Sequence, residues 1–243
     1  MRILVLSFYF QPDLSACSFR TTALVNQLKR DLDCQIDVVT TFPNRYASYT
    51  VDASEYEENA NVHIYRIALP PHKSGMLDQA KAFTRYYRKA LSFTRDQKYD
   101  MVFATSSRLF TAFLGARIAA RIKRPLYMDI RDIFVDTIKD VLPSKIAWIT
   151  KPVFSMVEKY AFDKAGRINL VSKGFAEYFK RRYPRTEFRW FTNGIDDEFL
   201  EFVPTAALTP VEGRSLRVLC AGNIGEGQGL HTILPALGKQ LDG

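Results

Sequence analysis

Short apolar runs alternate with longer segments of helical periodicity along most of the 243-residue chain. The apolar runs have strand length and are rich in β-branched and aromatic residues, which is typical of buried strands. They occupy residues 2–7, 35–40, 62–67, 100–105, 125–130, 167–172 and 188–191. Between them, apolar positions at helical spacing predict helices over residues 16–31, 77–96, 109–123, 144–164 and 173–183.

This alternation predicts an α/β fold with a doubly wound parallel sheet, because parallel neighbouring strands need a crossover that a helix supplies. Ligands of such sheets bind beyond the carboxyl ends of the strands. The segment 41–61 is polar and aromatic without a sustained period, and we expect a mobile loop there. Four segments that follow strands are the first candidates for a site: "FYFQPDLSACSFR", "TTFPNRY", "ATSSRLF" and "MDIRDIFVD".

The pattern changes after residue 191. Turn residues, two prolines and no sustained period indicate a linker over 198–215. The stretch "LRVLCAGNIGEGQGLHTIL" then reads as a strand, a glycine-rich loop and a helix. Such a loop lets backbone N–H groups approach a diphosphate at a helix N-terminus. We therefore expect a first Rossmann-like domain over 1–197 and, over 216–243, only the first strand-loop-helix unit of a second one.

Composition restricts the class of protein without naming one. The apolar fraction is 47% and the charged fraction 25%, as in ordinary globular proteins. No apolar run approaches the roughly 20 residues of a membrane-spanning helix, and "MRILVLSFYF" reads as a first strand rather than an export signal, so we expect a cytoplasmic protein. The formal charge of +8 favours anionic partners: nucleotides, nucleic acid or a lipid surface.

Metal and redox chemistry find no support in the residue spacing. The cysteines and histidines show neither metal-ligand spacing nor a disulfide framework, so we expect no metal and no cofactor. No G-x-G-x-x-G follows the first strand, which argues against a dinucleotide-dependent oxidoreductase, and no nucleic-acid-binding motif appears. The residues concerned are Cys17, Cys34, Cys220, His63, His72 and His231.

Seven motifs occur in one order along the chain: "SFYFQPD" with "FR", "TTFPN", "ATSSRLF", "DIRDIFVD", "LVSKGFAEYF", "TNGIDDEF" and "AGNIGEGQGLHTIL". Together they resemble the N-terminal half of family-4 glycosyltransferases of the GT-B fold, especially bacterial enzymes of the surface-polysaccharide type. The resemblance covers nearly the whole chain. It implies two facing Rossmann-like domains, the first holding most of the acceptor and the second most of the donor.

The resemblance also implies a reaction. A sugar would pass from a nucleotide-sugar donor to a lipid-linked saccharide acceptor in the cytosol, with retention and without metal. The family's paired-glutamate motif, E-x7-E, does not occur after the linker, so we expect the 243-residue chain alone to be inactive. The alternative is a nucleotide-binding or interaction module that lacks a catalytic partner domain.

The acidic and basic residues near the end of the run 125–130 are candidates for the chemistry. A carboxylate at Asp132 could orient the acceptor hydroxyl or take its proton, and Arg131 could hold a phosphate or carboxylate through two hydrogen bonds. Asp129 is assigned to acceptor binding and ranks below Asp132, because alternation along a strand turns the two to different surroundings. The alternative for all three is a salt bridge that fixes the loop.

Further acceptor-side candidates lie after the first and fourth runs. Ser15 and Ala16 stand where the family often has Gly-Gly. Arg20 is close to the start of the first helix, where a cation is disfavoured by the helix dipole, so contact with a ligand phosphate is the functional interpretation. Ser106 is assigned to acceptor binding, although capping of the next helix explains it better.

The glycine-rich loop holds the donor-side candidates. Its backbone amides and the following helix N-terminus would form the main anion site, because neutral side chains stand where many relatives have Arg and Lys. Asn193 and Gly194 form either a hinge between the two domains or a plain turn. The donor-binding residues are Gly222, Asn223, Gly225, Gln228 and Gly229.

The predicted helix 77–96 is a candidate for contact with an anionic membrane surface. A basic stripe at helical spacing stands beside an apolar face. The alternative is an amphipathic helix that packs on its own sheet with a solvated basic face. The stripe consists of Lys81, Arg85, Arg88 and Arg95, and the apolar face of Phe83, Tyr87, Ala90 and Leu91.

Overall fold

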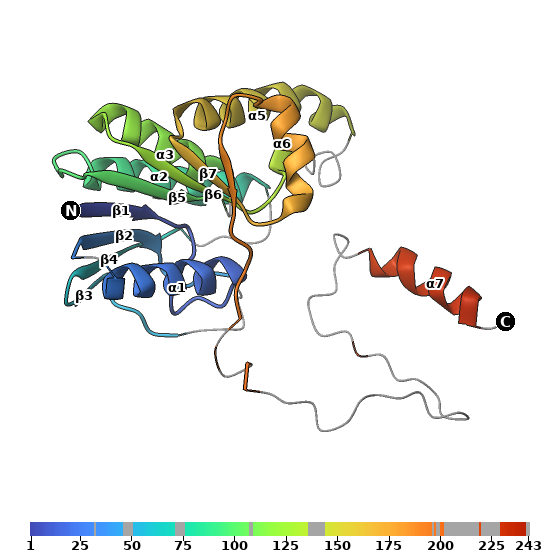
Figure 1. The fold of residues 1–243 in the computed structure, drawn as a ribbon, viewed down its shortest axis with the longest axis horizontal. Helices are drawn as coiled ribbons and strands as arrows, with labels where there is room; N and C mark the ends of the chain where they lie inside the picture. Colours follow the sequence, from blue (N-terminus) through green and yellow to red (C-terminus); the bar gives the residue numbers. More distant parts are fainter. Residues whose placement is uncertain are drawn as a thin grey trace. The chain divides into compact units, whose positions relative to one another are not determined.

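The computed structural model describes residues 1–31, 33–45, 51–70, 76–106, 109–135, 144–195, 197, 200–201, 219 and 229–241. The chain divides into two compact units, Met1–Gly194 and Ile195–Gly243. Figure 1 shows the elements of both. The predicted linker and the strand predicted to follow it lie almost wholly outside the described residues.

The first unit is built on one eight-stranded sheet with the order β3-β4-β2-β1-β5-β6-β7-β8. Every pair of neighbouring strands is parallel except β3 and β4, which are antiparallel. The strands are β1 (Arg2–Leu6), β2 (Gln35–Thr41), β3 (Tyr56–Asn59), β4 (Val62–Ile67), β5 (Met101–Thr105), β6 (Leu126–Ile130), β7 (Arg167–Leu170) and β8 (Phe188–Trp190).

Helices cover both faces of the sheet. The helix α1 lies on one side, while α2, α3, α5 and α6 lie on the other (Figure 1). Their bounds are α1 Ala16–Asp31, α2 Met76–Phe93, α3 Leu109–Ile122, α5 Ser144–Lys164 and α6 Ala176–Arg182, the last preceded by the 3₁₀ turn η1, Lys173–Phe175. This arrangement confirms the doubly wound α/β fold, and it follows because each crossover between parallel strands carries a helix.

Alternation along the central strands divides the core into two clusters. Leu4 and Leu6 of β1 belong to the larger cluster, together with residues of α2, α3 and α5, whereas Ile3 and Val5 belong to the smaller one with Val25 of α1. Successive side chains of a strand point to opposite faces, so one strand supplies both clusters.

One glycine allows a close helix–strand contact. A Cβ atom at Gly115 of α3 would lie 2.5 Å from the Cβ of Ala104 in β5 and 3.4 Å from the Leu126 Cδ1. Real Cβ atoms do not approach so closely, so α3 reaches this distance from the sheet because residue 115 has no side chain.

The prediction of a loop over 41–61 was wrong for four consecutive residues. Tyr56–Asn59 forms the edge strand β3, which pairs with β4 through Tyr56 opposite Tyr65 and Asn59 opposite Val62. Three of its four residues are exposed, and two glutamates break the apolar pattern. Edge strands commonly carry charge because it discourages pairing with other chains, which explains why periodicity missed this one.

The second unit contains α7 (Leu230–Leu241), which matches the helix expected after the glycine-rich loop. Gly229 precedes it with a positive φ of 64°, and its carbonyl accepts the N–H groups of Thr232 and Ile233. A positive φ is readily adopted by glycine. The apolar residues Ile233 and Leu234 are exposed.

Candidate functional site

The sheet has a topological switch point between β1 and β5. From β1 the chain first adds β2, β3 and β4 on one side, and then β5, β6, β7 and β8 on the other. Ligands of doubly wound sheets bind beyond the carboxyl ends of the strands at such a point. The segments that follow β1, β5 and β6 are therefore where a ligand site is expected.

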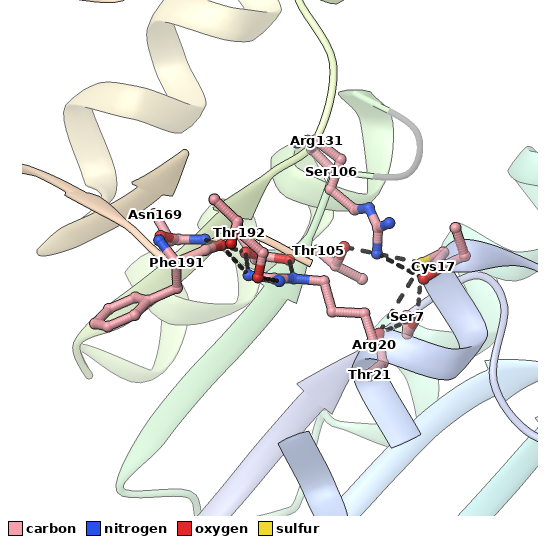
Figure 2. A network of polar contacts seen from close by, with 12 residues as sticks. Ser7, Cys17, Arg20, Thr21, Thr105, Ser106, Arg131, Asn169, Phe191 and Thr192 are labelled. Atoms are coloured by element: carbon pink, nitrogen blue, oxygen red, sulfur yellow. Dashed lines mark hydrogen bonds and ion pairs between the residues drawn. The ribbon is translucent and has the colours of Figure 1, made fainter. Parts of the chain in front are cut away.

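Below this edge, a buried polar cluster joins β1, α1 and β5 (Figure 2). The Ser7 hydroxyl donates to the carbonyl of Tyr9 at 2.6 Å and lies 3.4 Å from the Thr21 hydroxyl. Cys17 is buried between Ser7 and Thr105, with its Sγ 3.6 Å and 3.9 Å from their hydroxyl oxygens. These contacts fix the start of α1 against the ends of the two central strands.

The loop after β1 is held from the neighbouring strands. The carboxylate of Asp13 is buried and accepts the backbone N–H of Asn44 at 2.9 Å. Burial raises the pKa of Asp13, while the backbone N–H groups of Asn44, Arg45 and Leu14 lower it by less. Arg66 of β4 donates to the carbonyl of Gln11 at 2.8 Å.

The start of α1 is where the structure places Ser15 and Ala16. The Ser15 hydroxyl accepts the N–H of Ser18 at 3.1 Å, which makes it the N-cap of the helix. The Ala16 carbonyl accepts Nη1 of Arg131 at 3.1 Å. Both predicted residues thus lie at the carboxyl edge of the sheet.

All three guanidinium nitrogens of Arg20 donate hydrogen bonds within the protein. Nε and Nη2 donate to the two oxygens of Asp129 at 2.9 Å and 3.0 Å. Nη1 donates to the carbonyl of Thr192 at 2.6 Å, and Nη2 also donates to that of Phe191 at 2.7 Å. Figure 2 shows the guanidinium between α1 and the chain that leaves β8. Such a paired, two-pronged contact is among the strongest that arginine makes.

Asp129 is buried, and its second partner is Asn169 of β7. The Asn169 amide donates to Asp129 Oδ1 at 2.6 Å and to the Phe191 carbonyl at 3.1 Å, while its own oxygen accepts the Phe191 N–H at 2.6 Å. The residues Arg20, Asp129 and Asn169, with the Phe191 and Thr192 backbone, are called here the junction network. It gives Arg20 and Asp129 a positioning role, and their predicted contact with an acceptor stays a prediction.

The end of β6 places Arg131 and Asp132 differently from Asp129. The Ser106 hydroxyl accepts the Arg131 N–H at 3.1 Å, so this serine links β5 to β6, while Arg131 reaches α1 as described above. Asp132 is exposed. The protein around its carboxyl nevertheless raises its pKa by desolvation, and Arg131 lowers it by less. Among the residues described directly after β1, β5 and β6, Asp132 thus offers an exposed carboxylate at this edge.

The structure therefore brings most of the predicted acceptor side together and leaves the donor side undescribed. Gly222, Asn223, Gly225 and Gln228 lie outside the described residues, as do Ser107 and Arg108. Gly229 lies at the start of α7. Asn193 and Gly194 are the last residues of the first unit, and their hinge role stays a prediction.

Sequence reasoning missed several members of the site. Asn169 stands in the apolar stretch "RINL", and a polar residue in a buried strand is a usable signal because buried polar groups need partners. Ser7, Thr21 and Thr105 gave no such signal, since short hydroxyl residues are common at strand ends and in helices.

Within the described ranges, no group of three or more His, Cys, Asp or Glu side chains is placed to hold a metal ion. In that part of the chain no helix is both long and apolar enough to cross a bilayer.

Comparison with solved structures identifies proteins of similar fold. A sucrose-phosphate synthase segment from Thermosynechococcus elongatus is 11% identical with a TM-score of 0.55, and the match covers 82% of this chain and 93% of that one. Anabaena HepE in complex with UDP-glucose is 16% identical with a TM-score of 0.46, over 84% of this chain and 47% of that one. Arabidopsis thaliana UGT89C1 complexed with UDP is 15% identical with a TM-score of 0.48, over 78% and 51%.

The chain thus spans about half the length of HepE and of UGT89C1. At these identities the likeness concerns the fold alone. No curated protein matches the chain. The model of the family described as glycosyl transferase 4-like domain matches residues 17–194, which is well over half of the sequence and nearly all of the first unit. The resemblance to family-4 glycosyltransferases is confirmed, and this protein belongs to the glycosyl transferase 4-like domain family.

Proposed function

We propose that the protein takes part in glycosyl transfer from a nucleotide-sugar donor, and that its first unit binds the acceptor at the carboxyl edge of the sheet. The observation that carries this proposal is the family match over residues 17–194, which includes α1 from its second residue and the ends of β5 and β6. These are the elements that the topological switch point selects on physical grounds.

Asp132 and Arg131 are the side chains proposed to meet the acceptor. Asp132 is exposed, and its raised pKa makes it a better proton acceptor than an ordinary aspartate once it is ionised. Its role is to orient the hydroxyl that attacks the sugar. Arg131 supplies a fixed positive charge beside it, suited to a phosphate or carboxylate group of the acceptor.

The transfer is proposed to proceed with retention and without metal. In that mechanism the acceptor hydroxyl attacks the face from which the nucleotide leaves, and the departing phosphate oxygen accepts the proton. The donor loop, with Gly222, Asn223, Gly225, Gln228 and Gly229, would hold the diphosphate through backbone amides.

The acceptor is proposed to be a lipid-linked saccharide of a cell-surface polysaccharide pathway, which places the work at the cytoplasmic face of a membrane. The exposed side of α2 fits this setting. Its surface carries Lys81, Arg85, Arg88 and Lys89, which are all exposed. Four cations on one helix face attract anionic headgroups.

The structure also revises how α2 would meet a membrane. Ala82, Tyr86 and Ala90 are buried, and Phe83 and Tyr87 pack against the core. The apolar face of α2 therefore packs on the protein itself, as in the alternative considered above. In the described part of α2 the basic face stays exposed, and its association with a membrane remains a proposal.

The proposal is tested with the protein expressed from its own gene. The protein is incubated with a panel of radiolabelled nucleotide sugars and lipid-linked saccharides, and products are separated by chromatography. We expect transfer to one lipid acceptor where the donor domain is complete, none from residues 1–243 alone, and a loss of acceptor affinity in Arg131→Ala. Calorimetric binding of a nucleotide sugar without transfer to any acceptor would favour the non-catalytic module instead.

A further inference from the structure

We infer that the outward face of α5 inserts into the headgroup region of an anionic lipid bilayer. The face is formed by Trp148, Val153 and Met156 and is called here the α5 apolar stripe. This inference deepens the membrane association proposed above, but it concerns a different helix and a different kind of contact.

The α5 apolar stripe is exposed to an unusual degree. Trp148 retains 80% of its surface, Val153 54% and Met156 68%. The three fall within nine consecutive residues at helical spacing, and Pro152 between them is exposed as well. Single exposed apolar residues are ordinary, whereas several large ones on one helix face mark a surface that another phase or molecule covers.

Cations accompany the stripe. Lys151 is exposed within it, and Lys159 follows one turn beyond Met156. Lys159 pairs with Asp163 at 2.7 Å, a solvent-exposed contact that leaves the lysine near the surface. Tryptophan prefers the boundary between lipid and water, and lysine stems extend along apolar surface while their charges stay in water. This combination favours an anionic bilayer over an apolar protein groove.

The stripe is carried on a rigid support. Ring contacts connect α5 to α3: Phe154 lies 5.7 Å from Phe110, and Tyr160 lies 5.3 Å from Phe113. Phe113 in turn stacks on Tyr87 of α2 at 6.3 Å. The inward side of α5 is thereby committed to packing, so the outward residues are free to meet lipid without disturbing the core.

The helices α2, α3 and α5 lie in one layer on the same side of the sheet (Figure 1). Within that layer the outward side of α2 carries Lys81, Arg85, Arg88 and Lys89, whereas that of α5 carries Trp148, Val153 and Met156 with less charge. Charge attracts a protein to an anionic surface, whereas burial of apolar side chains holds it there. In this proposal α2 supplies the electrostatic attraction and α5 supplies the apolar burial.

The experiment uses Trp148 as its own reporter. The chain has two tryptophans, and Trp190 is replaced by phenylalanine, which keeps a ring beneath Lys180. The variant is mixed with vesicles of phosphatidylcholine alone or with phosphatidylglycerol. We expect the Trp148 emission to shift to shorter wavelength with the anionic vesicles only, and to be quenched by brominated lipid chains.

Substitutions then separate the two helices. Val153→Ser with Met156→Ser should weaken vesicle binding about tenfold, since both changes remove apolar burial without touching the core. Phe19→Ser is the matched control, because Phe19 is 59% exposed on α1, across the sheet, and should bind as before. Arg85→Glu should weaken the attraction at least about fivefold.

Each other outcome overturns the inference. Vesicle binding with Trp148 still in water would leave the proposed α2 contact standing and exclude insertion of α5. Equal loss of vesicle binding in Phe19→Ser and in the α5 double substitution would show that the α5 apolar stripe contributes no more than any other exposed apolar residue. Absence of vesicle binding would exclude both surfaces, and lipid-independent self-association abolished by the α5 substitutions would assign the stripe to a second copy of the chain. None of these readings depends on transferase activity.

Discussion

The amino and carboxyl edges of the sheet each hold a buried aspartate, but the two are held by different kinds of partner. Asp37 of β2 accepts from Arg2 and Tyr99 and lies 3.1 Å from Nδ1 of His63, all side chains at or near the starts of neighbouring strands. Asp129 of β6 accepts from Arg20 and Asn169, which also bind backbone beyond β8.

This difference in partners indicates a different role for each edge of the sheet. At the amino edge the partners of Asp37 are all side chains, so these contacts stabilise the packing of β1, β2 and β4 against one another. At the carboxyl edge Arg20, the partner of Asp129, also donates hydrogen bonds to the carbonyls of Phe191 and Thr192, close to the end of the first unit. The carboxyl edge therefore couples the site to the end of the unit.

Asp37→Ala is the substitution expected to have the largest effect. It removes the common partner of a buried tyrosine hydroxyl and a guanidinium, and breaking a buried pair in this way costs about 3–5 kcal/mol of unfolding free energy. Urea unfolding measures the loss. Because the amino edge lies away from the site, ligand affinity per folded molecule should stay unchanged.

Asp129→Ala is expected to cost less, about 2–3 kcal/mol. Arg20 keeps the carbonyls of Phe191 and Thr192 as partners, so its charge is not left alone. The distinctive result is local: the Phe191 amide should exchange its hydrogen faster. Equal destabilisation by both aspartate substitutions, with unchanged exchange at Phe191, would contradict the difference between the two edges.

Glu158 sharpens the comparison because it is a buried carboxylate outside the sheet. It accepts from the hydroxyl of Tyr183 at 2.8 Å and from Arg182 at 3.2 Å, and burial raises its pKa above 4.5 while these partners lower it by less. The folded protein then binds the proton more tightly than the unfolded chain. Stability is therefore greatest below about pH 4.5 for this group and falls as the pH rises through the folded pKa.

Glu158→Gln should remove that part of the pH dependence and alter stability at pH 7 by about 1 kcal/mol or less. Denaturant midpoints of the two proteins measured from pH 4 to pH 8 test it. Parallel curves over the whole range would show that Glu158 does not titrate differently on folding.

Arg131→Ala should have the smallest effect on stability, less than about 1 kcal/mol, since it loses one hydrogen bond to the Ala16 carbonyl from a partly exposed side chain. Its effect belongs to ligand binding, measured by titration with a lipid-linked saccharide. Arg131→Lys, which keeps the charge, is the matched control. A drop in melting temperature as large as that of Asp129→Ala would assign Arg131 to structure.

The sequence pattern was sufficient to predict the bounds of elements that bury one face along their whole length. The helices over 16–31 and 144–164 have the predicted bounds, and the strand over 62–67 does too. The antiparallel β3 was missed because its charged residues carry no apolar alternation. Local pattern reports burial of one face and gives no signal for a strand whose sides are both largely exposed.

The junction network could not be predicted for a different reason. Arg20, Asp129 and Asn169 are far apart in the chain, and only the order of strands brings them together. The α5 apolar stripe was missed because residues 146–157 are largely apolar on every side, so periodicity did not distinguish the buried face from the exposed one.

The contacts of Arg20 with Phe191 and Thr192 have a consequence for biosynthesis. They join residues 171 and 172 positions apart, so they cannot form until nearly the whole first unit has left the ribosome. At about 5–20 residues per second, the arginine waits roughly 10–30 s for its carbonyl partners. Until then the guanidinium is hydrated and can pair only with Asp129, so the contacts between α1 and the chain after β8 are among the last of the first unit to form.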